Sequence, residues 1–491
     1  MIPKDMPENH GLSSQDLLAF FRKIESLDLA VNGFMLLQDG KATAEFWREP
    51  YRKDSEQVLF SLSKSFTSIA IGIAWDEGYL SLDDQVAAFF PDKRPDPVSP
   101  HLEKMTIHHL LSMNAGHQAN IYEAVVKQQD WVKAFLSLEV EHEPGSYYQY
   151  STPAAYMLSA ILQRATGEGL VDFLMPRLFE PLGIPRPSWE TCPLGIAAGG
   201  MGLSLSAEGV AKFGLMLLHK GSFEGRRIVS ERYIELAVAE HSDNRKEGAP
   251  IDAAQGYGYQ FHRCRRGCYR GDGAFGQLCF VAPQHNLVIA ANCSFPSMRP
   301  LHTLLDLIYE HIIDQLDANA SLPTVEGAEM SFRFKRQSAV LPAAVASENH
   351  PYWSRVSKSY RMADNPNGVE QMIISLNHDE LELRLHYRDG REQSLPFHFS
   401  QPVEAETVFW KDLCLHMQKV VTYAAWRDNT TLQLTMYYIE TPYVVDYTIR
   451  LDEVSIDVQF DINVSMNLSG YHMTGSLETG HQENLHLARR Q

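Results

Sequence analysis

Ser61 and Lys64, a serine and a lysine three residues apart, stand near the start of the apolar segment 60–75. On a helix this spacing puts both side chains on one face, so the amine would lie beside the hydroxyl. The free N–H groups and the positive dipole end of the first helical turn favour an alkoxide at Ser61, and the same field, with burial, favours a neutral Lys64. A neutral lysine accepts a proton near neutrality, so the pair predicts a nucleophilic serine activated by an amine.

The apolar residues of this segment strengthen the prediction. A chain of this length contains about one Ser-x-x-Lys by chance, so the spacing alone carries little weight. Phe66, Ile69 and Ile73 recur at helical spacing, however, and indicate a mostly buried helix that ends at Gly78. A lysine at one end of a buried helix requires a reason, and a catalytic role supplies one.

A serine–lysine pair also needs a proton carrier for the leaving group and N–H donors for the oxyanion. Tyr150 lies in the turn-rich segment 144–153, just before an expected helix. It can shuttle a proton if Lys64 and the helix end lower its pKa from about 10. The Ser-Thr-Pro that follows Tyr150 favours it over two neighbouring phenols, Tyr147 and Tyr148.

Periodicity and turn residues predict the elements that would position these groups. A β-hairpin is expected over 32–51, and strands over 257–264, 277–282 and 287–293. Helices are expected over 60–75, 80–90, 154–166, 206–221 and 301–313, and after a Thr106 cap. The glycine-rich segment 271–277 leads into a strand and can pass close to a substrate carbonyl. This order predicts an α/β fold of the α+β type, with one antiparallel sheet flanked by helices and a helical subdomain.

With 491 residues and 44% hydrophobic content, the chain is globular and too long for one ordinary core. Two domains are therefore expected: residues 1–316, which hold the serine–lysine pair, and a smaller all-β C-terminal domain at 346–491. The segment between them, 317–345, is expected to be a linker. The β domain can cover the cleft, bind substrate or mediate dimerisation, and the sequence does not choose among these roles.

The formal net charge of −18 argues against binding to nucleic acid or to an anionic membrane surface, because both need a basic surface. The first residues contain no apolar stretch of signal-peptide length, which predicts a cytoplasmic protein. The six cysteines show no Cys-x-x-Cys spacing, so no disulfide framework or zinc ribbon is indicated. Cys264 and Cys268 can form a metal or redox site with His262, but a hairpin turn at 264–268 is favoured.

Several segments, taken together and in order, resemble the serine β-lactamase and penicillin-binding-protein superfamily, specifically its class C-like serine hydrolase and esterase branch. The resemblance covers roughly residues 14–314 and depends on the segments 60–66, 76–78, 106–113, 199–203 and 276–283. It implies a β-lactamase-like fold, with Ser61 as the acylated nucleophile and Lys64 as its activating partner. Tyr150 would be the general base that also protonates the leaving group. The resemblance calls for no metal and no organic cofactor.

The resemblance also assigns the substrate-binding positions. Thr152 stands where the family's Tyr-x-Asn motif usually has asparagine, and its hydroxyl can still form a hydrogen bond. Gly271, Asp272 and Gly273 match the third motif, which is Lys-Thr-Gly or His-x-Gly in many members. The oxyanion donors would then be the N–H groups of Ser61 and Ala274.

The residues around position 271 depart from the family pattern. The family's cation there normally faces the carboxylate of a β-lactam or of a peptide terminus, so efficient β-lactamase activity is not expected. Arg270 can replace the cation only if its side chain turns into the cleft, and Asp272 would instead favour an amine-bearing substrate. Alternatively, both charges are solvated at the strand end.

The sequence thus predicts a serine hydrolase that forms an acyl-enzyme at Ser61 and cleaves an ester or amide of a small molecule or short peptide. A D-aminopeptidase, a short-chain esterase and a weak β-lactamase remain open, although the lack of an export signal counts against a cell-wall substrate. The alternative from another class is a catalytically silent binding or scaffold protein that keeps the fold. A homo-oligomer is compatible with both.

Overall fold

The computed structural model describes residues 2–318 and 356–478. The chain divides into two compact units, one of Met1–Trp47 and Arg52–Arg333 and the other of Arg48–Tyr51 and Phe334–Gln491. Apart from residues 317 and 318, the expected linker 317–345 lies outside the described residues. Within the described ranges, no helix combines the length and the apolar content needed to cross a bilayer.

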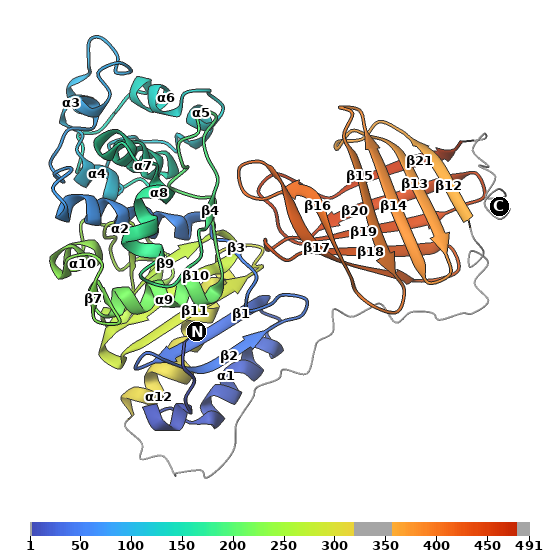
Figure 1. Cartoon of the computed structure of the whole chain (residues 1–491), viewed down its shortest axis with the longest axis horizontal. Helices are drawn as coiled ribbons and strands as arrows, with labels where there is room; N and C mark the ends of the chain where they lie inside the picture. The colour runs from blue at the N-terminus through green and yellow to red at the C-terminus, as the bar shows by residue number, and fades with distance from the viewer. Residues whose placement is uncertain (1, 319–355, 479–491) are drawn as a thin grey trace, which may run out of the picture. The chain divides into compact units, whose positions relative to one another are not determined.

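A six-stranded antiparallel sheet forms the centre of the first unit (Figure 1). The strands lie in the order β2-β1-β11-β10-β9-β8, so the N-terminal hairpin pairs with the strands from the end of this unit. Their bounds are β1 Val31–Gln38, β2 Lys41–Trp47, β8 His262–Arg263, β9 Tyr269–Gly273, β10 Gln277–Ala282 and β11 Leu287–Cys293. The predicted antiparallel sheet that collects both ends of this region is confirmed, and β10 and β11 have their predicted bounds.

Helices pack on both faces of this sheet. On one face, Phe21 of α1 (Ser14–Ser26) lies edge-on to Phe34 of β1, with ring centroids 5.7 Å apart. On the other face, α9 (Ala207–Leu218) approaches β11 so closely that a Cβ on Gly214 would lie 2.4 Å from Val288 Cγ1. Apolar side chains from both faces of the strands are therefore buried, which explains the continuous burial of β1, β10 and β11. The C-terminal helices of this unit are α11 Arg299–Ile308, a π-helical turn Tyr309–Ile313 and α12 Asp314–Asp317.

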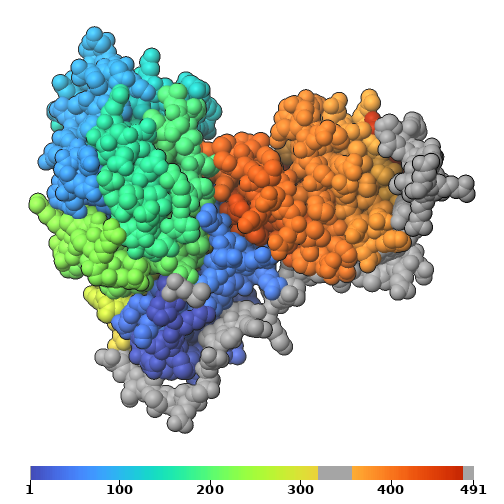
Figure 2. Space-filling view, viewed as in Figure 1, coloured from blue at the N-terminus to red at the C-terminus, as the bar shows by residue number. Residues whose placement is uncertain are grey.

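The helical subdomain gathers at one end of the first unit, and α1 and α12 lie at the other end (Figures 1 and 2). Its core pair is α2 (Ser63–Asp76) and α7 (Thr152–Thr166), and α7 begins at the cap Ser151, whose side chain accepts from Ala154 N. The remaining helices are α3 Pro100–Lys104, α4 Ile107–Leu111, α5 Tyr122–Val126, α6 Trp131–Ser137, α8 Leu170–Leu174 and α10 Glu231–Val238. The predicted Thr106 cap of α4 is confirmed.

Two predicted elements are shorter than expected because their backbone groups bond elsewhere. In place of a helix over 80–90 there is one 3₁₀ turn, Val86–Phe89, since Gln85 bridges Thr106 and Val86 N donates to Met105 O. Of the predicted strand 257–264, residues 262 and 263 form β8. The 264–268 segment is a hairpin turn between β8 and β9, as favoured, with Cys264 N donating to Cys268 O at 2.8 Å.

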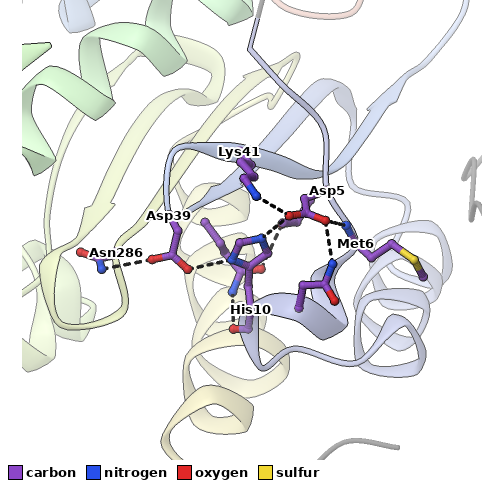
Figure 3. Close-up of polar contacts among 9 residues, drawn as sticks. Asp5, Met6, His10, Asp39, Lys41 and Asn286 are labelled. Atoms are coloured by element: carbon purple, nitrogen blue, oxygen red, sulfur yellow. Dashed lines mark hydrogen bonds and ion pairs between the residues drawn. The ribbon is translucent and has the colours of Figure 1, made fainter. Parts of the chain in front are cut away.

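A polar cluster ties the N-terminal segment to the β1–β2 hairpin (Figure 3). The His10 imidazole lies between two carboxylates, with Nδ1 2.7 Å from Asp39 Oδ2 and Nε2 3.2 Å from Asp5 Oδ2. Lys41 Nζ donates to the same Asp5 oxygen at 2.6 Å, and Asn286 Nδ2 donates to Asp39 at 3.1 Å. These charged contacts add to the backbone pairing of the same segment with the edge strand β2, where Lys4 bridges Ala42 and Ala42 N donates to Pro3 O at 2.8 Å.

The second unit contains a ten-stranded antiparallel sheet in the order β15-β14-β13-β12-β21-β20-β19-β18-β17-β16. The two ends of this order meet, because Gln393 Nε2 of β15 donates to Thr407 of β16 and Thr422 of β17 donates to Pro396 O of β15. The sheet is thus nearly closed into a barrel, and the predicted all-β C-terminal part is confirmed. The strands are β12 Val356–Met362, β13 Val369–Asn377, β14 Glu380–Tyr387, β15 Glu392–His398, β16 Val403–Trp410, β17 Leu415–Trp426, β18 Thr431–Tyr438, β19 Val444–Leu451, β20 Ser455–Ile462 and β21 Tyr471–Leu477.

Candidate active site

Ser61 lies in a 3₁₀ turn, Phe60–Leu62, that runs directly into α2. The preceding Phe60 has a φ of 48°, a left-handed conformation that a bulky residue rarely adopts. Its ring packs edge-on to Phe275, with centroids 5.0 Å apart, and this contact holds the strained turn in place. The nucleophile predicted from the sequence is therefore presented by a sharp turn at the start of a buried helix.

The Lys64 amine is buried and surrounded by three oxygens. Its Nζ lies 2.9 Å from Ser61 Oγ, 3.1 Å from Thr152 Oγ1 and 2.7 Å from the carbonyl oxygen of Gly200. A neutral amine fits this geometry with its two N–H groups directed to Thr152 and Gly200 and its lone pair directed to the Ser61 hydroxyl. The predicted proximity of the amine and the hydroxyl is thus present, and Thr152 contacts the amine.

Tyr150 completes the group around Ser61. The Ser61 hydroxyl is near enough to the Tyr150 phenol to affect its pKa, and Lys64 Nζ lies 4.9 Å from the centroid of the Tyr150 ring. Burial raises the pKa of Tyr150, the charge of Asp272 adds to this effect, and the Ser61 hydroxyl only partly opposes it. The expectation that Lys64 and the helix end lower this pKa is therefore wrong, because desolvation outweighs them. Tyr150 is a neutral phenol at neutral pH.

Strand β9 runs directly against the turn that carries Ser61. A Cβ on Gly271 would lie 2.4 Å from Ser65 Oγ, and a Cβ on Gly273 would lie 2.1 Å from the carbonyl oxygen of Leu59. A side chain at 273 would meet the backbone, and one at 271 would fit only if the side chains of Leu62 and Ser65 moved. Ala274 follows at the end of the strand, where the chain enters a short turn with Phe275 at a φ of 63°.

The charges beside these glycines form a buried ion pair. Arg270 Nε donates to Asp272 Oδ2 at 2.7 Å, and the two side chains are 2% and 8% exposed. Arg270 Nη1 also donates to Asp252 O at 2.7 Å and lies 3.1 Å from Cys264 Sγ. Arg270 does not replace the missing cation, because these acceptors hold it. The interpretation as solvated strand-end charges is also wrong, since both groups are buried.

Sequence reasoning missed His262 as a member of this site. Its ring stacks on Tyr150 at an interplanar angle of 23°, with centroids 6.2 Å apart, and its Nε2 lies 3.6 Å from Asp272 Oδ1. Burial lowers the pKa of His262 to about 4, so the imidazole is neutral at neutral pH. The available signal was the predicted strand 257–264, which pairs His262 with Arg270 across β8 and β9.

The sequence profile of the Beta-lactamase family matches residues 29–307, more than half of the chain. The chain belongs to the beta-lactamase family. This membership confirms the predicted superfamily and the predicted class of enzyme, a serine hydrolase. Ser61, Lys64 and β9 all lie within the matched region.

The chain is similar to two curated proteins that are named as hydrolases or esterases and to one solved structure of a penicillin-binding protein homologue. The chain is 25% identical over 326 residues to the 6-aminohexanoate-dimer hydrolase of Paenarthrobacter ureafaciens, and this match covers 59% of this chain and 80% of the relative. It is 28% identical over 152 residues to Esterase EstB of Burkholderia gladioli, covering 28% of this chain and 38% of the relative. An octameric penicillin-binding protein homologue from Pyrococcus abyssi shares the fold with a TM-score of 0.51 and 16% identity, over 94% of this chain and 99% of the homologue.

Proposed function

We propose that this protein hydrolyses an ester or amide through an acyl-enzyme formed on Ser61. The observation that carries the proposal is the convergence of an amine and a phenol on one hydroxyl. Lys64 Nζ lies 2.9 Å from Ser61 Oγ and 4.9 Å from the centroid of the Tyr150 ring, and the Ser61 hydroxyl is near enough to the phenol to affect its pKa. A structural role alone does not account for a buried lysine at this point. In the catalytically silent alternative, these three groups would have no chemistry to perform.

The protonation state of Tyr150 divides the roles of the two proton carriers. Because the phenol stays protonated at neutral pH, Lys64 takes the proton of Ser61 as the oxygen attacks the carbonyl carbon. Tyr150 then gives its proton to the leaving group as the bond to that group breaks. The proton held by Lys64 restores the phenol, and water releases the acyl group by the reverse sequence. This assigns the base to Lys64 and keeps Tyr150 as the acid.

The N–H groups of Ser61 and Ala274 are the proposed oxyanion donors. Support comes from Gly273, which lets the end of β9 lie against the turn that holds Ser61. Thr152, at the position of the asparagine in the family motif, positions the amine, because its hydroxyl lies 3.1 Å from Lys64 Nζ. We therefore place Thr152 in the activation of the nucleophile.

The names of the relatives support an ester or amide substrate of small size. One is called a 6-aminohexanoate-dimer hydrolase and another an esterase. The test is a panel of p-nitrophenyl esters, D-aminoacyl p-nitroanilides and a chromogenic cephalosporin. Ser61→Ala is expected to reduce turnover of the best substrate by at least about 10³-fold. Ser137→Ala, at an exposed helix position, is the matched control. Equal turnover by wild type and Ser61→Ala would reject the proposal.

We also propose that the protein self-associates. The support is limited to the fold shared with an octameric homologue over nearly the whole chain. Light scattering coupled to size-exclusion chromatography gives the mass in solution, and a mass of one 55.6 kDa chain at micromolar concentration would reject self-association.

A further inference from the structure

The ion pair of Arg270 and Asp272 has no role in the proposed acyl transfer, although it lies beside the nucleophile. The glycines on both sides of Asp272 in β9 face the turn that carries Ser61. Side chains alternate along a strand, so Asp272 projects from the opposite side of β9. Its charge adds to burial in raising the pKa of Tyr148 and of Tyr150. The carboxylate is therefore within electrostatic reach of the proposed acid.

Arg270 orients this carboxylate and is not available to a substrate. Its Nε donates to Asp272 Oδ2, and its Nη1 is directed to Asp252 O and to Cys264 Sγ. A guanidinium held by three protein acceptors cannot turn to bind a substrate carboxylate without leaving a buried acceptor unpaired. The ion pair thus fixes one oxygen of Asp272 and leaves the other for a different partner.

The remaining atoms of this cluster have spare hydrogen-bonding capacity. Asp272 Oδ1 lies 3.6 Å from His262 Nε2, which is longer than a hydrogen bond. His262 Nδ1 is buried and has no hydrogen-bond partner among the residues at 2–318 and 356–478. The His262 side chain is 20% exposed, so solvent reaches one side of the cluster. Burial opposes ionisation of Asp272, but His262 and Arg270 outweigh it and keep its pKa below the usual value.

We propose that Asp272 Oδ1 and the imidazole of His262 form a subsite for an N–H-donating group of the substrate, above all an ammonium group. The inference rests on the proposed acyl transfer at Ser61 and names the substrate class for that site. The carboxylate supplies the charge, and a charge-assisted hydrogen bond to it is stronger than a neutral one. The neutral imidazole, stacked on Tyr150, supplies a second hydrogen-bonding atom next to the proposed acid.

The same cluster disfavours a substrate that carries a carboxylate at this position. The amine of Lys64, beside Ser61, is already directed to Ser61, Thr152 and Gly200 and is not available to a substrate carboxylate. A second carboxylate near Asp272 would meet a like charge in a poorly solvated site. The subsite therefore favours a cationic substrate group. The cation that many family members carry at the position of Gly271 would favour an anionic one.

A matched series of aryl acetates tests this selection. The acetates of 4-(aminomethyl)phenol, 4-ethylphenol and 4-(carboxymethyl)phenol differ mainly in the charge of the para substituent. We expect kcat/KM to be about tenfold higher for the ammonium ester than for the ethyl ester, with the carboxylate ester lowest. Glycine p-nitroanilide compared with acetic p-nitroanilide places the ammonium on the acyl side instead. A preference in either pair supports the subsite and shows which side of the scissile bond it contacts.

Asp272→Asn removes the charge and keeps the shape of the side chain. It is expected to reduce the ratio of kcat/KM between the ammonium and ethyl esters to about one. Because this change leaves Arg270 buried without its partner, the same ratio is also measured in the double variant Arg270→Gln with Asp272→Asn. Asp172→Asn removes an exposed acidic group, 62% exposed and paired with Arg186, and controls for the change in net charge.

A measurement on the wild type is independent of how the variants fold. Butylammonium and butyrate, which differ in charge, are tested as competitive inhibitors of 4-ethylphenyl acetate hydrolysis. The subsite predicts a lower inhibition constant for butylammonium. Equal inhibition, or stronger inhibition by butyrate, overturns the subsite when the ethyl ester is still hydrolysed in a Ser61-dependent manner. Loss of that hydrolysis would instead overturn the acyl transfer itself, so the two failures are distinguishable.

Discussion

Thr152 is the residue at which this chain departs most clearly from the motif it resembles, and the structure gives the departure a consequence. The Thr152 hydroxyl lies 3.1 Å from Lys64 Nζ. An asparagine at this position would reach further, whereas threonine ends at the amine. Thr152, the residue that differs from the motif, thus orients Lys64, the proposed base.

Thr152→Val keeps the shape of the side chain and removes one hydrogen bond to the amine. We expect kcat to fall about tenfold, with KM changed little, because a net hydrogen bond of about 1–1.5 kcal/mol is lost from the activation step. Steady-state kinetics on the best ester of the panel measures both constants. Thr166→Val, at the other end of α7, is the matched control because its hydroxyl bonds a helix carbonyl. An unchanged kcat in Thr152→Val would remove the positioning role.

The raised pKa of Tyr150 determines the expected pH profile. Burial stabilises the protonated phenol, so Tyr150 remains an acid as pH rises and loses its proton only above its ordinary value of about 10. We expect no loss of kcat from this group between pH 7 and about 9.5, and Tyr150→Phe should lower kcat by about 10²-fold. Tyr147→Phe is the control. A basic limb near pH 8 that disappears in Tyr150→Phe would contradict the assignment.

At the scale of the element, β9 carries the greatest demand on packing. Its glycines let the strand lie in contact with the turn that holds Ser61. The same glycines are the reason that the sequence did not predict this strand, because glycine is a poor strand former. By contrast, β10 and β11 contain alternating and β-branched residues, and their bounds were predicted correctly. The helix expected over 80–90 does not form for another reason. The backbone of this segment pairs instead with residues 105 and 106, which are distant in sequence.

Gly273→Ala is expected to damage the site more than Gly271→Ala. The new Cβ at 273 would meet a backbone oxygen at 2.1 Å, whereas at 271 it would meet the ends of two side chains, which can move. We expect at least a 10²-fold loss of kcat/KM for Gly273→Ala, from displacement of the proposed oxyanion donor. Gly169→Ala, with φ −65° and 3.5 Å to the nearest atom, is the control. Wild-type activity in Gly273→Ala would show that β9 does not position the donor.

At the scale of the whole molecule, the chain divides into two units, and neither unit is one continuous stretch of sequence. Residues 48–51, which follow β2, belong to the second unit. Tyr51 is 3% exposed and packs with the barrel residues Val421, Tyr423 and Ile439. Composition indicated the all-β unit correctly, but no local pattern could assign four residues of the N-terminal region to it.

Tyr51→Ala therefore tests the composition of the second unit. Removing a buried aromatic ring is expected to lower its free energy of unfolding by about 3 kcal/mol. Hydrogen exchange of β17 and β18 under native conditions reports this loss strand by strand. Tyr79→Ala, at a position 43% exposed, is the control. Unchanged exchange in β17 would show that Tyr51 adds nothing to the barrel.

How much of the site was predictable also depends on scale. Helical spacing predicts that Ser61 and Lys64 are adjacent. The position of Tyr150 just before a helix indicates that it belongs to the same site. The burial of Asp272 and the position of His262 were not predictable, because both depend on contacts with residues distant in sequence, such as Asp252, and on the path of the β8–β9 hairpin.

Covalent labelling of the wild-type protein tests the central claim most directly. A fluorophosphonate probe is incubated with the folded protein, and the modified peptide is located by mass spectrometry. The account predicts one adduct, on Ser61, that forms faster than in Lys64→Met and is absent from Ser61→Ala. A folded, unlabelled wild type, or an adduct on another serine that persists in Ser61→Ala, would contradict it.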